Sequence, residues 1–231
     1  MTGPVDLAAL CLPFLVAAGA GYVLGSLPFG FLVARAKGVN IFEVGSRSPG
    51  ATNVRRVLGK GPGNTVFVLD VAKGALAAGW PLAWFYLALA RKPSETQAVT
   101  LSDVAILGYL GLAFALLGHS FSCFTGFRGG KGVATASGGF LVLLPYVVLI
   151  AAAIWVAVFY AGRYVSLASI AAALSLPILS LSFHCGNLAL GATILTAIFV
   201  VVRHRANLGR LLSGTEKRFE RRRPSVGKDG P

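Results

Sequence analysis

One loop of this 231-residue chain combines small, hydroxyl-bearing and cationic residues in a way that suits phosphate binding. It reads GSRSPGATN (residues 45–53) and is followed by Arg55 and Arg56. Its glycines let backbone N–H groups approach an anion, and a guanidinium matches a phosphate with two parallel hydrogen bonds. Arginines in such a loop also follow from membrane topology alone, so this segment leaves both explanations open.

A second loop, GFRGGKG (residues 126–132), precedes an apolar segment that should be helical. A helix N-terminus has free N–H groups and the positive end of the helix dipole, which favour phosphate, and Lys131 adds a charge. The run is not a Walker loop, because Gly132 stands where GxxxxGK[ST] requires Ser or Thr. Four glycines in seven residues exceed what a turn needs, which favours an anion site over a flexible basic turn.

A third polar group follows the last apolar block, and it consists of His204, Asn207, Arg210, Gly214 and Glu216. His204 and Asn207 are three residues apart, so they share a face if the helix continues. Taken alone, this group is better explained as a solvated basic end that contacts lipid headgroups.

Two further positions carry ionisable side chains within or beside apolar segments. Asp70 and Lys73 have the i,i+3 spacing of a structural ion pair, with the role of Lys73 left open. His119 lies at the end of an apolar block, where it could act as a base or as a hydrogen-bond donor. The three cysteines are widely separated and predict neither a disulfide framework nor a metal site.

The elements that must position these loops are membrane helices. Hydrophobic residues make up 55% of the chain and charged residues 13%, and the apolar residues form long blocks. These blocks cover about residues 7–34 with a kink at 25–30, 64–89, 104–124, two short helices meeting near Pro145 within 133–161, 167–183 and 188–202. The pattern predicts an all-α, polytopic membrane protein of about seven helices, with a polar loop from about 38 to 63.

The distribution of charge predicts the orientation. The net charge is +13, and Lys and Arg gather in the two loops and the tail, as the positive-inside rule describes for cytoplasmic segments. This explanation is preferred to nucleic-acid binding. Seven crossings then place the N-terminus outside and the C-terminus in the cytoplasm. We expect a single transmembrane domain over residues 1–219 and a basic tail over 220–231 that is disordered or touches lipid.

Together, these segments resemble the bacterial membrane acyltransferases that use acyl phosphate as donor and glycerol 3-phosphate as acceptor, the PlsY family. The matching stretches are GSLPFGFLVARAKGVNIFEVGSRSPGATNVRRVLGKGPG (25–63), VLDVAKG (68–74), GHSFSCFTGFRGGKGVAT (118–135) and RHRANLGRLLSGTE (203–216). They stand in the family's order and, with the helix pattern, cover nearly the whole chain. The combination is specific, although each stretch alone is not.

The resemblance implies transfer of a fatty acyl group from acyl phosphate to the 1-hydroxyl of sn-glycerol 3-phosphate, giving lysophosphatidate and phosphate in phospholipid biosynthesis. It places the enzyme in the bacterial inner membrane with its active site facing the cytoplasm. The residues it implies for glycerol 3-phosphate are Ser46, Arg56, Lys131, His204 and Asn207, of which Ser46, Arg56 and Lys131 are expected to act in catalysis. The residues it implies for acyl phosphate are Thr52, Asn53, His119, Gly129, Gly130 and Gly132.

No cofactor or metal is expected, because acyl phosphate is already activated and positioning with charge stabilisation suffices. The expected partners are acyl phosphate, glycerol 3-phosphate and membrane lipids, with other phospholipid-synthesis enzymes as further candidates. A phosphate oxygen of the donor is expected to take the hydroxyl proton, and His119 and His204 are the rival bases. The alternative functions are an organic-phosphate transporter and a phosphotransferase. The first would place its site at the midplane, and the second would need acidic metal ligands.

Three positions depart from the family pattern, and they concern the fine geometry of the site more than the class of reaction. Ser48 stands where the family usually has Asn, Ser122 where it usually has Pro, and Arg128 where Lys is common. Serine keeps a hydrogen-bonding group at residue 48, and arginine keeps the positive charge at residue 128.

Overall fold

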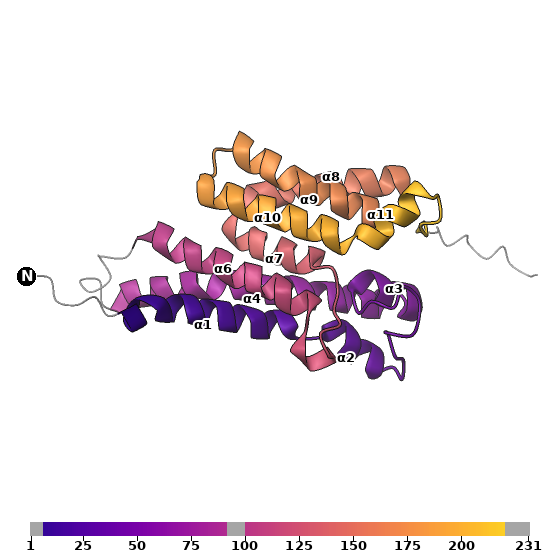
Figure 1. Cartoon of the computed structure of the whole chain (residues 1–231), viewed down its shortest axis with the longest axis horizontal. Helices are drawn as coiled ribbons and strands as arrows, with labels where there is room; N and C mark the ends of the chain where they lie inside the picture. The colour runs from indigo at the N-terminus through magenta and orange to yellow at the C-terminus, as the bar shows by residue number, and fades with distance from the viewer. Residues whose placement is uncertain (1–6, 92–99, 220–231) are drawn as a thin grey trace, which may run out of the picture.

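The computed structural model describes residues 7–91 and 100–219, and within these ranges the chain is all-helical (Figure 1). The helices are α1 (Leu7–Ser26), α2 (Phe29–Arg35), α3 (Ala51–Leu58), α4 (Lys60–Arg91), α6 (Leu101–Ser120), the short 3-10 helix η1 (Cys123–Thr125), α7 (Val133–Leu143), α8 (Pro145–Gly162), α9 (Val165–Ser182), α10 (Asn187–Arg203) and α11 (Arg205–Leu212). The expected basic tail at 220–231 lies outside the described residues.

The predicted breaks at proline are confirmed. The first apolar block divides into α1 and α2 at Leu27 and Pro28, where the Lys73 Nζ donates to the Leu27 carbonyl over 3.0 Å. The long block after residue 133 divides at Pro145, which opens α8. Proline favours the first turn of a helix, because its missing N–H needs no partner there.

The expected polar loop at 38–63 is only partly a loop, and this prediction was wrong for its second half. Helix α3 occupies Ala51–Leu58, and α4 begins at Lys60 after Gly59, whose φ is +93°. The helix forms because it is amphipathic: Val54 is fully buried in a small apolar cluster that includes Ile41 and Val66.

Close backbone contacts at small residues join the helices. A Cβ added at Gly21 would collide with the backbone of Gly111, so α1 and α6 pack directly against each other. At Gly74 a Cβ would meet the backbone of Thr135, which brings α4 against α7. Glycine contacts of this kind are typical of membrane helix packing, where backbones approach through small side chains.

Among the described residues, five helical segments are long and apolar enough to cross a membrane, and a sixth is possible if α10 and α11, bent by 60°, count as one span. Helix α7 has 11 residues and so is about 16 Å long, well short of a hydrocarbon core of about 30 Å. Seven crossings and an external N-terminus therefore stay predictions.

The tertiary arrangement brings the predicted polar segments to one end of the bundle. In Figure 1, α2, α3 and α11 lie at the same end, and the connection between α6 and α7 reaches toward it. Helix α7 lies between a layer containing α1, α4 and α6 and a layer containing α8, α9 and α10. Residues Gly129 to Gly132, which we call the glycine run, directly precede α7.

Candidate active site

The first loop is organised by the amide of Asn53, which is 2% exposed. Its Nδ2 donates to the carbonyls of Val44 and Ser48 at 3.1 and 3.0 Å, and its Oδ1 accepts from the Ser46 N–H at 2.8 Å. Asn53 would have to give up one of these bonds to contact a ligand directly. The structure thus gives Asn53 a supporting position beneath the loop, which the sequence did not indicate.

The loop presents Ser46 at the surface. Gly45 and Arg47 on either side of it have φ values of +62° and +55°, so the backbone turns sharply there. Within the described part of the chain, Ser46 takes part in hydrogen bonding only through its backbone N–H, and the Thr52 hydroxyl bonds to no protein group. Both hydroxyls are therefore available, but no contact joins them to the cationic residues described below.

The conformation of the glycine run is fixed by side chains that donate hydrogen bonds to the carbonyl of Gly130. The Arg203 Nη2 donates to the Gly130 carbonyl at 2.8 Å, and the Ser120 Oγ donates to the same oxygen at 3.2 Å. The Gly130 N–H is also engaged, because it donates to the His119 carbonyl at 3.0 Å. Of the N–H groups expected to bind a phosphate, that of Gly130 is already used.

The remaining N–H groups of the run have a different environment. Within residues 7–91 and 100–219, the N–H groups of Gly129, Lys131 and Gly132 donate to no protein acceptor. The C=O of Gly130 and the N–H of Lys131 belong to one trans peptide and point in opposite directions. Because Arg203 holds the carbonyl, the Lys131 N–H is turned away from Arg203.

Below the glycine run lies a buried group of ionisable residues, Asp70, Lys73 and His119. Asp70 and Lys73 are each 3% exposed, and their Oδ1 and Nζ atoms lie 2.8 Å apart. The His119 Nδ1 is 3.6 Å from the same Oδ1, too far for a hydrogen bond. A Cβ on Gly130 would collide with the imidazole, so His119 packs beneath the run.

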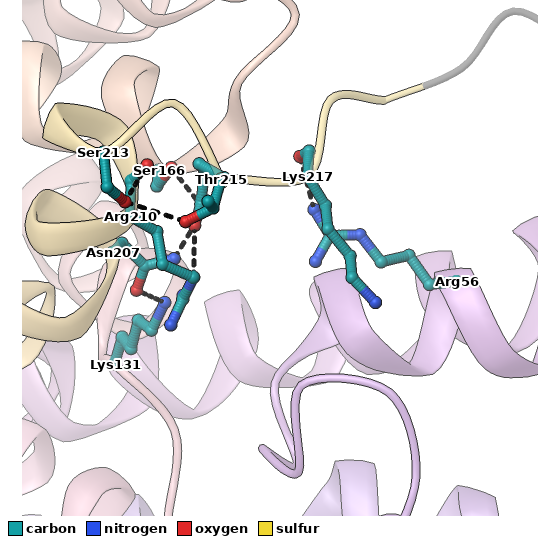
Figure 2. Close-up of polar contacts among 9 residues, drawn as sticks. Arg56, Lys131, Ser166, Asn207, Arg210, Ser213, Thr215 and Lys217 are labelled. Carbon is teal, nitrogen blue, oxygen red and sulfur yellow. Dashed lines mark hydrogen bonds and ion pairs between the residues drawn. The ribbon is translucent and has the colours of Figure 1, made fainter.

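The predicted glycerol-phosphate residues Lys131 and Asn207 meet at the end of the bundle (Figure 2). The Lys131 Nζ donates to the Asn207 Oδ1 at 2.5 Å, and the Asn207 Nδ2 donates to the Glu216 Oε1 at 2.6 Å. Ser166 also donates to Oε1, at 2.7 Å, while the Arg210 Nε pairs with Oε2 at 2.7 Å. Asn207 therefore bridges a lysine and a carboxylate.

This cluster carries more positive than negative charge. The pKa of Lys131 is lowered to about 8, chiefly because the side chain is buried. Glu216 opposes this shift, and the charges of Arg210, Arg56 and Arg203 contribute to it. Burial alone would raise the pKa of Glu216, but hydrogen bonds from Ser166, Asn207 and Arg210 hold that pKa below its usual value. One ionised carboxylate thus faces several cations, and an added anion would be stabilised there.

Arg56 joins the cluster from α3. Its Nη2 donates to the Lys217 carbonyl over 3.4 Å, and its guanidinium lies 5.7 Å from the centre of the Phe219 ring. Figure 2 shows the Arg56 side chain directed toward the segment after α11. Its charge is also felt at Lys131, where it lowers the pKa.

His204 lies at the bend between α10 and α11 and is 3% exposed. Its Nδ1 lies 2.8 Å from the Val200 carbonyl, which can only accept, so Nδ1 carries the proton. In a neutral imidazole this leaves Nε2 as an acceptor. His204 is therefore better suited to accept from a hydroxyl than to donate to a phosphate.

The departures from the family pattern have structural explanations at two positions. Ser122 donates from Oγ to the Ser26 carbonyl at 2.6 Å, which ties the segment before the glycine run to the end of α1. The Arg128 guanidinium stacks over the Phe42 ring at 4.3 Å, which joins the second loop to the first.

Several residues were not singled out from the sequence, namely Ser120, Ser166, Arg203 and Phe219. Arg203 directly follows an apolar block, where topology alone explains an arginine, and Phe219 is a lone aromatic residue among charged ones. Ser166 could have been suspected as a polar residue early in an apolar helix. In the described part of the chain, no three His, Cys, Asp or Glu side chains gather as a metal site would require.

The chain matches the family model described as "Glycerol-3-phosphate acyltransferase" over residues 15–214. A relative of that name from Fusobacterium nucleatum is 44% identical over 200 residues, covering 86% of this chain and 94% of the relative. Another, from Geobacter sulfurreducens, is 40% identical over 206 residues, covering 89% and 97%.

Solved structures agree. A crystal structure described as PlsY (YgiH), an integral membrane glycerol 3-phosphate acyltransferase in its glycerol 3-phosphate form, has a TM-score of 0.76 and 36% identity. The match covers 90% of this chain and 96% of the PlsY chain. The lysophosphatidic acid form gives a TM-score of 0.74 over 90% and 95% of the two chains. With several helices apolar enough to cross a membrane, the present chain is a multi-pass membrane protein.

Proposed function

Since this chain belongs to the glycerol-3-phosphate acyltransferase family, which the PlsY structures represent, we propose that it uses acyl phosphate as the acyl donor. It transfers the fatty acyl group to the 1-hydroxyl of sn-glycerol 3-phosphate and forms lysophosphatidate and phosphate. The observation that carries this proposal is the excess of positive charge around the Lys131–Asn207 pair, directly beside a glycine run with free N–H groups. A reaction between two phosphorylated substrates requires two adjacent anion sites.

The acceptor phosphate is assigned to the cationic cluster. Lys131 and Arg56 approach from different elements, and a guanidinium can bind two phosphate oxygens at once. His204 is placed to accept from a glycerol hydroxyl through Nε2. Ser46 is the remaining proposed ligand, and within the described residues it forms a hydrogen bond only through its backbone N–H, to Asn53. The two similar structures are a glycerol 3-phosphate form and a lysophosphatidic acid form, which supports this acceptor and this product.

The donor phosphate is assigned to the glycine run and the start of α7. The N–H groups of Gly129, Lys131 and Gly132 are free to donate, and the N-terminus of α7 adds its dipole. Thr52 is a further proposed ligand from the first loop. We assign supporting roles to Asn53, which shapes that loop, and to His119, which packs beneath the run.

Acyl transfer then proceeds without a dedicated protein base. The acceptor hydroxyl oxygen attacks the acyl carbonyl carbon, the bond between that carbon and the phosphate oxygen breaks, and the proton passes to a donor phosphate oxygen. Lys131 and the N–H groups stabilise the negative charge that develops. His204 remains the rival base, because its Nε2 is an acceptor. His119 is less suited to that role because it lies beneath the glycine run.

The same proposal extends to cellular placement. The described end of the bundle that carries the cationic cluster is the cytoplasmic one, because basic segments concentrate there. The protein lies in the bacterial inner membrane as a single domain over residues 1–219, and other enzymes of phospholipid synthesis are its candidate partners.

The decisive experiment is an assay of the purified, detergent-solubilised protein with palmitoyl phosphate and glycerol 3-phosphate, following both phosphate and lysophosphatidate. We expect the two products in equal amounts, with no phosphate released when the acceptor is omitted. Transfer from palmitoyl-CoA in place of palmitoyl phosphate, or phosphate release without acceptor, would overturn the donor assignment. His204→Gln should raise KM for glycerol 3-phosphate and leave measurable turnover. Abolished kcat at unchanged KM would instead identify His204 as the base.

A further inference from the structure

The segment that follows α11, residues 213–219, crosses the end of the bundle and touches both sides of the cationic cluster. We call it the C-terminal strap. Figure 2 shows it passing from Ser213 and Thr215, beside Ser166, to Lys217, which lies against Arg56. Helix α3 and helix α11 are therefore linked at this end by a segment outside both of them.

The end of the strap is anchored to the connection between α8 and α9. The Phe219 N–H donates to the Arg163 carbonyl at 2.9 Å, and the Arg163 Nε donates back to the Phe219 carbonyl at 2.9 Å. Next to this pair, the Arg218 Nε donates to the Tyr164 hydroxyl at 2.8 Å. Three hydrogen bonds at successive residues fix the direction in which the strap ends.

This anchoring places the Phe219 ring between an aromatic residue and two arginines. Its centre lies 5.9 Å from that of Phe159, with the rings nearly perpendicular, and 5.4 and 5.7 Å from the guanidinium carbons of Arg55 and Arg56. A guanidinium near an aromatic ring is attracted by the ring's quadrupole, which restricts its orientation. The neighbouring Lys217 carbonyl accepts from the Arg56 Nη2 at 3.4 Å.

The middle of the strap acts on the opposite side of the cluster. The Glu216 carboxylate accepts from the Asn207 Nδ2, which turns the amide so that its Oδ1 faces Lys131. One short segment therefore determines the orientation of Arg56 from α3 and of Asn207 from α11. If the strap only held the end of α11 against the bundle, it would need no contact with Arg56 or Asn207.

We propose that the C-terminal strap aligns the acceptor phosphate site, and that Phe219 is the positioning residue that orients Arg56 within it. This inference rests on the proposed function, because it assumes that Arg56 contacts the phosphate of glycerol 3-phosphate. It adds a distinct requirement: the aromatic face of residue 219 affects the acceptor, while the donor, held by the glycine run, is unaffected.

The test compares Phe219→Leu, which keeps an apolar side chain without the ring, with Phe219→Tyr, which keeps the ring. We expect Phe219→Leu to raise KM for glycerol 3-phosphate about three- to fivefold, the loss of a partly exposed cation–π contact. In Phe219→Leu, the KM for palmitoyl phosphate should stay within about twofold of the wild-type value. In Phe219→Tyr, both KM values should equal those of the wild type. Calorimetric titration of glycerol 3-phosphate without donor should show the same change in Kd.

Leu212→Ala is the matched control, because Leu212 ends α11 with 90% of its surface exposed. Arg163→Ala is a second variant, which keeps the Phe219 side chain but removes the hydrogen bond from the Arg163 Nε to the Phe219 carbonyl. Because the ring is then held less firmly, this variant should raise the same KM. An unchanged Kd in Phe219→Leu, or equal shifts for both substrates, would overturn the role of the strap while wild-type turnover still supported the proposed function. Wild-type protein that neither bound nor acylated glycerol 3-phosphate would overturn both.

Discussion

The guanidinium of Arg203 donates a hydrogen bond to the carbonyl oxygen of Gly130 over 2.8 Å, and so the last residue of α10 fixes the conformation of the glycine run before α7. The two residues are 73 positions apart. The contact holds the carbonyl side of the run and leaves the Lys131 N–H turned away from Arg203. A residue of a distant helix thus determines which backbone donors can face a phosphate.

We therefore predict that Arg203→Met lowers kcat at least about tenfold and raises KM for acyl phosphate, because lost oxyanion-type donors commonly cost this much or more. The kcat and KM of Arg203→Lys should lie between those of the wild type and of Arg203→Met, since a lysine keeps the charge but not the planar donor arrangement. Steady-state kinetics with each substrate varied would measure this. Arg205→Met, at an exposed residue of the next helix, is the control, and an equal loss in it would contradict the assignment.

The pH dependence of activity should report Lys131. Its pKa is lowered to about 8, so the side chain is charged below that pH and loses its proton as the pH rises through it. We predict that kcat/KM for glycerol 3-phosphate falls above about pH 8 by roughly tenfold per pH unit. Activity that stayed level to pH 9.5 would contradict a required ammonium group.

Phosphate binding should also raise the pKa of Lys131, because an opposite charge favours the protonated form. Calorimetric titrations near pH 8.5 in buffers of different ionisation enthalpy would then detect proton uptake as glycerol 3-phosphate binds. Lys131→Met should abolish that uptake. Uptake that persisted in Lys131→Met would assign the proton to another group.

The close packing beneath the glycine run predicts a sharp effect of one methyl group. A Cβ at Gly130 would collide with the His119 imidazole, whereas one at Gly191 in α10 meets nothing within 4 Å. We expect Gly130→Ala to lower kcat/KM by about tenfold or more by displacing the run. Gly191→Ala should preserve activity and stabilise the helix by up to about 1 kcal/mol. Full activity in Gly130→Ala would show that the run tolerates displacement.

The buried Asp70–Lys73 pair predicts a stability effect. Removing one partner leaves an uncompensated buried charge, so Asp70→Asn should destabilise the protein by about 3–5 kcal/mol. The double variant Asp70→Asn with Lys73→Met should recover part of this loss. Thermal unfolding in detergent, followed by tryptophan fluorescence, would compare the variants. A double variant less stable than Asp70→Asn would indicate that Lys73 stabilises mainly through its bond to the Leu27 carbonyl.

Much of the fold could be predicted because its signals are local. Apolar blocks give the helices, and Pro28 and Pro145 mark two breaks that the structure confirms. Helix α3 was missed because its amphipathic pattern spans only eight residues within a polar segment. It is stabilised by packing of Val54 against residues from other segments, which no local pattern records.

The sequence by itself identified a helical membrane protein and predicted phosphate-binding residues in three polar segments, because hydropathy and residue type are local properties. Only the tertiary structure decided which residues of those segments contact one another. Lys131 and Asn207 meet across 76 positions, Arg203 reaches the glycine run across 73, and Asn53 turns inward rather than toward the surface. Such contacts depend on how helices pack, and packing brings together residues whose spacing along the chain carries no sign of it.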